Sequence, residues 1–89
     1  MLETSIIIRT KNEEKWIGEN LRRLADQTNK NFEVIIVDSG SIDKTLDVIN
    51  QFSELLNIRI FKIKPEDFSY PFALNYGVRQ SLAEKYLVF

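Results

Sequence analysis

Four short apolar runs alternate along the chain with three stretches in which apolar residues recur at helical spacing. The apolar runs cover residues 4–9, 32–37, 58–63 and 86–89. The helical stretches cover residues 14–27, 41–56 and 73–85. Strands that alternate with helices, joined by right-handed crossovers, predict an α/β fold with a parallel sheet.

The run at residues 32–37 is almost continuously apolar, which is typical of a strand buried on both faces of a parallel sheet. The run at residues 58–63 alternates apolar with basic positions, as an edge strand does. Residues 64–72 contain two prolines and are expected to lack regular structure while the chain crosses back past the first strand. We therefore predict a three-layer, Rossmann-like sheet with strand order 3-2-1-4.

Polar residues follow the first two predicted strands where each ends, at Thr10, Asn12 and Glu13 and again from Asp38 to Gly40. Ligands of open α/β sheets bind beyond the carboxyl ends of the strands, so these residues are candidate ligand contacts. Helix capping explains several of them equally well. Asp38 and Ser41 suit the start of the second helix, and Thr10 with Glu13 has capping-box spacing.

The apolar faces of the helical stretches predict which side chains are buried. Trp16 adjoins the apolar face of the first helix, so we expect it to be partly buried in the core instead of stacking on a ligand. In the third helix the expected buried residues are Leu74, Val78, Leu82 and Ala83.

Composition limits the chemistry that this chain can perform. Its 89 residues suffice for one small domain, and 12 basic against 13 acidic residues give no basic stripe for nucleic acid. Cysteine and histidine are both absent, so any metal would need oxygen ligands, which favours Mg²⁺ or Mn²⁺. No segment has the pattern of a signal peptide or a transmembrane helix. We therefore expect a cytoplasmic location, with peripheral attachment to the inner face of the membrane as the alternative.

Two segments taken together resemble the opening of family 2 glycosyltransferases. Residues 5–13 resemble the pattern S-hydrophobic-I-I-x-[TA]-x-N-E, and residues 32–45 resemble E-[VI]-I-V-V-D-[DS]-G-S-x-D-x-T. Residues 24–28 resemble the L-x-x-Q-T that ends the first helix of that family. Phe68 with residues 72–77 resembles the aromatic loop and helix start of rhamnosyltransferase-like members.

The resemblance implies a GT-A fold that binds a nucleotide-diphospho-sugar and transfers the sugar with inversion in glycan or polysaccharide synthesis. It implies Mg²⁺ or Mn²⁺ in the full-length enzyme. It also implies nucleotide contacts at Thr10, Asn12, Glu13, Asp38, Ser39 and Gly40. Ser39 stands where many members carry a second Asp.

In that family the metal-binding D-x-D follows the strand that begins here at Tyr86, and the catalytic base comes later still. The resemblance therefore implies that residues 1–89 are the N-terminal donor-binding part, without catalytic or metal-ligating residues of their own. Such a part is expected to bind no metal and to be inactive alone.

Two other functions are compatible with a parallel α/β sheet. A receiver-like signalling domain needs an acidic pair at the end of its first strand, where Arg9 and Thr10 stand here. A non-catalytic nucleotide-binding or interaction module of the same fold stays open. The strand order also leaves one sheet face covered by a single helix, so we expect exposed apolar surface around Ile35 and Val37 and association into a homo-oligomer.

Overall fold

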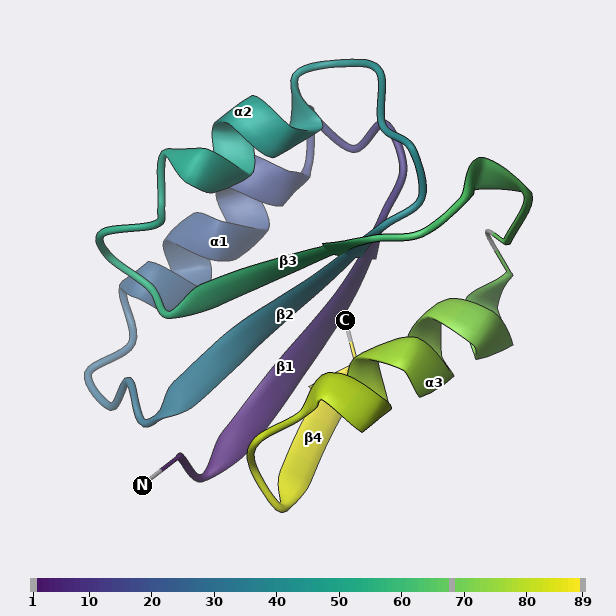
Figure 1. Cartoon of the computed structure of the whole chain (residues 1–89). Helices are drawn as coiled ribbons and strands as arrows, with labels where there is room; N and C mark the ends of the chain where they lie inside the picture. Colours follow the sequence, from purple (N-terminus) through teal and green to yellow (C-terminus); the bar gives the residue numbers. More distant parts are fainter. Residues whose placement is uncertain (1, 68, 89) are drawn as a thin grey trace.

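The computed structural model describes residues 2–67 and 69–88 of the chain (Figure 1). Its elements in order are β1 (Thr4–Thr10), α1 (Ile17–Ala25), β2 (Phe32–Asp38), α2 (Thr45–Asn50), β3 (Ile58–Lys62), a 3₁₀ turn at Pro65–Asp67, α3 (Tyr70–Gln80) and β4 (Lys85–Val88). All strand pairs are parallel and their order is β3-β2-β1-β4. The predicted fold class and strand order are confirmed.

Three layers are visible, with α1 and α2 on one face of the sheet and α3 on the other (Figure 1). Val34 and Ile36 pack in the core under α1 and α2, while Ile35 and Val37 pack under α3. All four side chains are 0% exposed, which confirms that β2 is buried on both faces.

The expected apolar exposure around Ile35 and Val37 is therefore wrong, because α3 covers that face. Exposed apolar side chains lie instead on β4, where Tyr86, Leu87 and Val88 are 50%, 57% and 37% exposed. β4 ends the sheet beside β1, so less of the molecule covers it than covers β2.

All three helices are shorter than predicted or shifted along the chain. α1 begins at Ile17, after a turn over residues 14–16, and α2 extends only from Thr45 to Asn50 before the chain continues in turns. Apolar periodicity extends through such turns, because their side chains also pack on the sheet, so periodicity alone overestimates helix length.

α3 begins before Pro71, a residue expected to interrupt regular structure. Ser69 caps this helix and accepts a hydrogen bond from the Phe72 N–H at 3.2 Å. Pro71 then lies in the first turn, where its missing N–H costs nothing. Because α3 starts early it also ends early, and the predicted burial of Leu82 is wrong, since this side chain is 71% exposed. Ala73 and Gly77 are buried on α3, and the predicted Leu74 and Val78 are partly buried against the same core. Phe68 lies outside the described residues.

A buried carboxylate on β2, which the sequence pattern did not reveal, ties the amino-terminal ends of the strands together. Glu33 is 0% exposed and accepts hydrogen bonds from Ser5 Oγ at 2.6 Å and from the Leu82 N–H at 2.7 Å. Arg59 donates to the other carboxylate oxygen from Nε at 3.0 Å and from Nη2 at 2.6 Å. Arg59 also donates to the carbonyl of Gln80, so the end of α3 is fastened to three strands.

Candidate functional site

The carboxyl ends of β1 and β2 bring two of the predicted site residues into direct contact. Thr10 and Asp38 are partners in the parallel register, and Thr10 Oγ1 donates a hydrogen bond to Asp38 Oδ1 at 2.7 Å. Each residue is only 1% exposed. The two loops that leave these strands therefore begin from a fixed, buried junction.

Asp38 accepts four hydrogen bonds, three of which come from the turn that follows it. Besides Thr10, its Oδ1 accepts from the Ser41 hydroxyl, and its Oδ2 accepts from the N–H groups of Gly40 at 3.1 Å and Ser41 at 3.0 Å. Burial raises the pKa of this carboxyl, but the hydrogen bonds from Ser41, Thr10 and Gly40 outweigh it and hold the pKa below its ordinary value. Asp38 is thus a charged acceptor at neutral pH.

The capping hypotheses for Ser41, Thr10 and Glu13 are wrong. α2 begins four residues after Ser41, whose hydroxyl binds Asp38 and accepts the Asn12 N–H at 2.9 Å. The Thr10 hydroxyl is engaged with Asp38, and the Glu13 N–H donates to Thr45 Oγ1 at 2.7 Å. These groups join the two loops to each other and do not cap separate helices.

Both the backbone conformation at position 40 and the close approach of Pro65 require a glycine there. Its φ is +88°, and a Cβ placed on it would lie 2.7 Å from Cγ of Pro65. Pro65 opens the 3₁₀ turn after β3, so a third loop packs against the turn at the end of β2. The sequence indicated the Ser-Gly-Ser turn but not its partner, because Pro65 is 25 positions away along the printed sequence.

The predicted burial of Trp16 in the core is wrong, because this side chain is 63% exposed. It lines a cavity of about 190 Å³ at the end of β1, together with Thr10, Glu13 and Asn20. Trp16 lies in the turn at residues 14–16 that precedes α1, one position before the buried Ile17.

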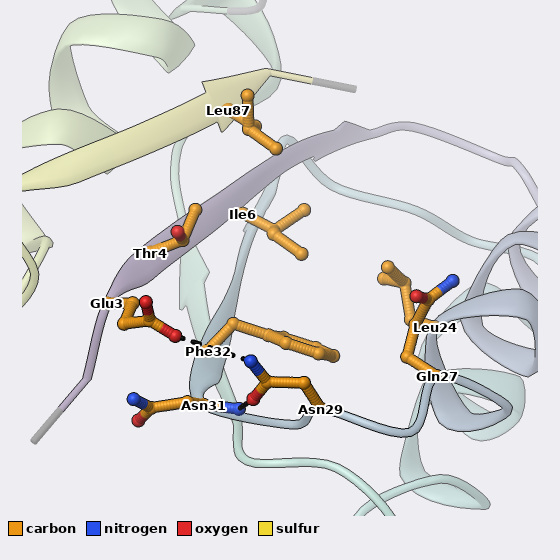
Figure 2. Close-up of a pocket in the computed structure, with 9 residues that line it drawn as sticks. All are labelled: Glu3, Thr4, Ile6, Leu24, Gln27, Asn29, Asn31, Phe32 and Leu87. Carbon is orange, nitrogen blue, oxygen red and sulfur yellow. Dashed lines mark hydrogen bonds between the residues drawn. The ribbon is translucent and has the colours of Figure 1, made fainter.

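A larger cavity of about 300 Å³ lies at the opposite, amino-terminal edge of the sheet (Figure 2). Its apolar lining comes from Ile6, Leu24, Phe32 and Leu87, and polar groups such as Glu3 and Asn29 surround it. None of the predicted site residues lines it. Size alone therefore does not identify the site.

The described residues do not form a metal site. Among them no group of three or more Asp, Glu, His or Cys side chains is placed to hold an ion. The oxygens of Asp38 are already occupied by protein donors, and Asp43 accepts from the Thr45 N–H at 2.9 Å and from the Glu14 N–H at 3.3 Å. These carboxylates therefore do not fit a divalent cation.

All six residues predicted to contact nucleotide lie at this edge, Thr10 and Asp38 at the ends of β1 and β2 and the other four on the loops that follow, and hydrogen bonds join the two segments. The sequence reasoning missed Asp43 and Thr45, which complete the connection on the second loop. Their signal was present as the D-x-T that follows the turn in the family pattern.

No helix in the described part of the chain is long and apolar enough to cross a bilayer.

The comparison with protein families gives the class directly. The family model described as "Glycosyl transferase family 2" matches residues 5–89. The chain therefore belongs to glycosyltransferase family 2, as its two opening motifs suggested.

Similar curated proteins are transferases that are considerably longer than this chain. A dolichyl N-acetyl-α-D-glucosaminyl phosphate 3-β-D-2,3-diacetamido-2,3-dideoxy-β-D-glucuronosyltransferase of Methanococcus voltae is 36% identical over 96% of this chain and 27% of its own length. The poly(ribitol-phosphate) β-N-acetylglucosaminyltransferase TarS of Staphylococcus aureus is 36% identical over 72% of this chain and 12% of its own length. The chain thus spans about a quarter or less of these relatives.

Solved structures agree with the fold. A crystal structure of S. aureus TarS in complex with UDP superposes with a TM-score of 0.92 at 31% identity, over 99% of this chain and 27% of that one. A TarS complex with UDP-GlcNAc gives 0.85 at 32% identity, over 98% and 26%. A Pyrobaculum calidifontis mannosyltransferase in complex with GDP-Man and Mn²⁺ gives 0.70 at 26% identity, over 89% and 24%.

Proposed function

We propose that this chain is the donor-binding part of an inverting glycosyltransferase, which transfers sugar from a nucleotide-diphospho-sugar to an acceptor in glycan or polysaccharide synthesis. One observation carries the proposal. The loops at residues 10–13 and 38–41 lie side by side at the carboxyl edge of a parallel sheet, joined by the 2.7 Å Thr10–Asp38 hydrogen bond. Ligands of such sheets bind at this edge.

In the proposed complex the nucleotide lies against Thr10, Asn12 and Glu13 on one loop and Asp38, Ser39 and Gly40 on the other. Asp38 is an acceptor only, so it fits an N–H of the base or a hydroxyl of the ribose, which would replace the Ser41 hydroxyl at Oδ1. The small residues of the second loop let the nucleotide approach the backbone.

The first test is a titration of the ¹⁵N-labelled chain with UDP. Amide shifts are expected at residues 11–13 and 39–41, and the amides at residues 29–32 serve as an internal control because they lie at the other edge. Thymidine diphosphate and GDP, titrated in the same way, compare the bases. Shifts confined to residues 29–32, or no shifts at all, would contradict the proposal.

A substitution provides the second test. Asp38→Ala removes the acceptor and should weaken UDP binding, whereas Asp26→Ala removes an exposed acid at the end of α1 and should not. Far-UV circular dichroism of both variants separates loss of binding from loss of fold. Unchanged UDP affinity in a folded Asp38→Ala variant would exclude Asp38 as a nucleotide contact.

The remaining features of the enzyme are part of the same proposal. The full-length protein would use Mg²⁺ or Mn²⁺ bound by a D-x-D motif that follows residues 1–89, and the catalytic base would lie there as well. For the sugar, residues 72–77 favour rhamnosyl, while the TarS complex with UDP-GlcNAc supports N-acetylglucosaminyl. Assaying UDP-GlcNAc and dTDP-rhamnose as donors of the full-length enzyme decides between them.

For the 89-residue chain by itself we propose self-association through β4. This strand is paired on one edge only, and three consecutive apolar residues on it are exposed, so the same edge of a second copy can pair with it. Sedimentation should detect a dimer or larger oligomer that Leu87→Lys dissociates. A monomer at high concentration would contradict this. We also propose that the protein is cytoplasmic, at most peripheral to the membrane, and cell fractionation tests this.

A further inference from the structure

Asn12 combines an unusual backbone conformation with a side chain that is already engaged. Its φ is +56°, a left-handed conformation that L-residues other than Asn, Asp and Gly seldom adopt. Its side-chain oxygen Oδ1 accepts the N–H of Ile42 at 2.8 Å and that of Asp43 at 3.4 Å. Its own N–H donates to Ser41 Oγ at 2.9 Å.

These three bonds connect points about thirty positions apart in the sequence, on the two loops of the candidate site. Asp38 fixes the first part of the second loop, up to the Ser41 N–H, and Asn12 fixes the next two N–H groups. The side-chain oxygen takes the place that a backbone carbonyl would occupy in a regular element. Without the Asn12 oxygen, the N–H groups of Ile42 and Asp43 would have to donate to water, which reaches this exposed position.

We propose that Asn12 is a positioning residue, which holds the loop at residues 40–43 in the arrangement that receives the nucleotide and makes no essential contact with the ligand itself. The inference rests on the proposed function, and it refines the direct nucleotide contact that the family resemblance implied for this residue. Only Asn and Asp combine tolerance of positive φ with an acceptor oxygen at the required reach.

Three variants separate the two properties of Asn12. Asn12→Gly keeps the backbone conformation and loses the acceptor, whereas Asn12→Ala loses both. Asn12→Asp keeps both and loses only the side-chain NH₂, which is the group a direct ligand contact would use as a donor. Because a carboxylate would also repel a diphosphate, uridine is used as a second, uncharged probe beside UDP.

Two readouts are measured for each variant. One is the affinity for UDP and uridine, and the other is the hydrogen-exchange rate of the Ile42 and Asp43 amides relative to the Val34 and Ile36 amides of β2. If Asn12→Gly leaves the loop in its binding arrangement one-tenth of the time, uridine affinity falls about tenfold. Asn12→Asp should bind uridine within about twofold of the natural chain.

The outcomes decide between the alternatives. Faster exchange at Ile42 and weaker uridine binding in Asn12→Gly, both restored in Asn12→Asp, support the proposal. Weak uridine binding in Asn12→Asp with Ile42 still protected means that the NH₂ contacts the ligand directly and overturns it. Unchanged exchange in Asn12→Gly overturns it as well. If the natural chain binds neither probe, the proposed function fails, while the exchange data still decide whether Asn12 holds the loop.

Discussion

Single residues at the carboxyl edge of the sheet hold the loop conformations through hydrogen bonds within the protein. Asp38 accepts one hydrogen bond from Thr10 and three from the turn that follows it, and Asn12 Oδ1 accepts from the next two backbone N–H groups. A nucleotide would therefore meet a loop whose shape already exists before it arrives. Preorganisation of this kind lowers the entropy that binding must overcome.

Gly40 offers the sharpest test of this preformed turn. In Gly40→Ala the methyl group is disfavoured at φ +88° and would lie 2.7 Å from Pro65, so the turn and the loop after β3 must move apart. The backbone contribution alone should cost about 1–3 kcal/mol, measured as a lower urea midpoint. UDP binding should weaken with it.

Gly18→Ala is the matched control for this substitution. Gly18 lies in α1 without a positive φ, and the added methyl would meet only Val48 Cγ1 at 3.2 Å. Removing a helical glycine gains about 0.5–1 kcal/mol, which offsets that close contact. Equal urea midpoints for the two variants would mean that the turn at Gly40 is not constrained.

Much of the site was predictable from the sequence, because the position of a residue after a parallel strand determines the edge on which it lies. Thr10 and Asp38 follow two adjacent strands, so their proximity required only the strand order. The partners of Asn12 and Gly40 were not predictable. They depend on loop conformations that bring together residues about 25 to 30 positions apart, and no local periodicity encodes such contacts.

At the scale of elements, the ion pair between Glu33 and Arg59 joins β2 and β3 to the end of α3. Apolar patterning predicted the strands but gave no reason to single out Glu33, since one acid at the start of an apolar run resembles a solvated strand end. The structure instead buries it completely and satisfies it with donors from β1, β3 and the segment after α3.

The Glu33 carboxylate should make the free energy of unfolding depend on pH in the acid range. Burial raises the pKa of Glu33, but hydrogen bonds from Ser5, Leu82 and Arg59 outweigh it and hold the pKa below its ordinary value of 4.5. A lowered folded-state pKa stabilises the fold above that ordinary value, and this stabilisation is lost as the pH falls further and passes the folded-state pKa. The free energy of unfolding, measured by urea titration from pH 7 to pH 2, should decrease below about pH 4.5.

Glu33→Gln should remove this contribution to the acid dependence and cost about 1–3 kcal/mol at pH 7, because Arg59 and the Leu82 N–H donate to different carboxylate oxygens and one of these becomes an NH₂ group that cannot accept. The control is Glu19→Gln, which breaks the exposed pair with Arg23 in α1 and should cost at most about 1 kcal/mol. If both variants lose stability equally and retain the same acid profile, the buried network contributes nothing specific.

At the scale of the whole molecule, the chain has a complete parallel core and a preformed loop pair, but among its described residues it has no cluster of ligands for a cation. Catalysis by transfer from a nucleotide-diphospho-sugar requires the charge of the leaving diphosphate to be neutralised, commonly by a divalent ion. We therefore expect nucleotide binding by this chain to be weak and independent of Mn²⁺.

Calorimetry of the 89-residue chain with UDP, with and without Mn²⁺, tests this expectation. A single carboxylate leaves most of the octahedral shell of Mg²⁺ or Mn²⁺ to water, and a cation at Asp38 would have to displace hydrogen bonds that both of its oxygens already accept. The two affinities should agree within about twofold, a difference of about 0.4 kcal/mol. Because UDP itself binds Mn²⁺, the titration is repeated with uridine, and with Mn²⁺ alone added to the protein. Saturable binding of Mn²⁺ alone, together with UDP affinity raised about tenfold or more, would place a complete metal site within these residues and contradict the assignment of the metal to a later part of a longer chain.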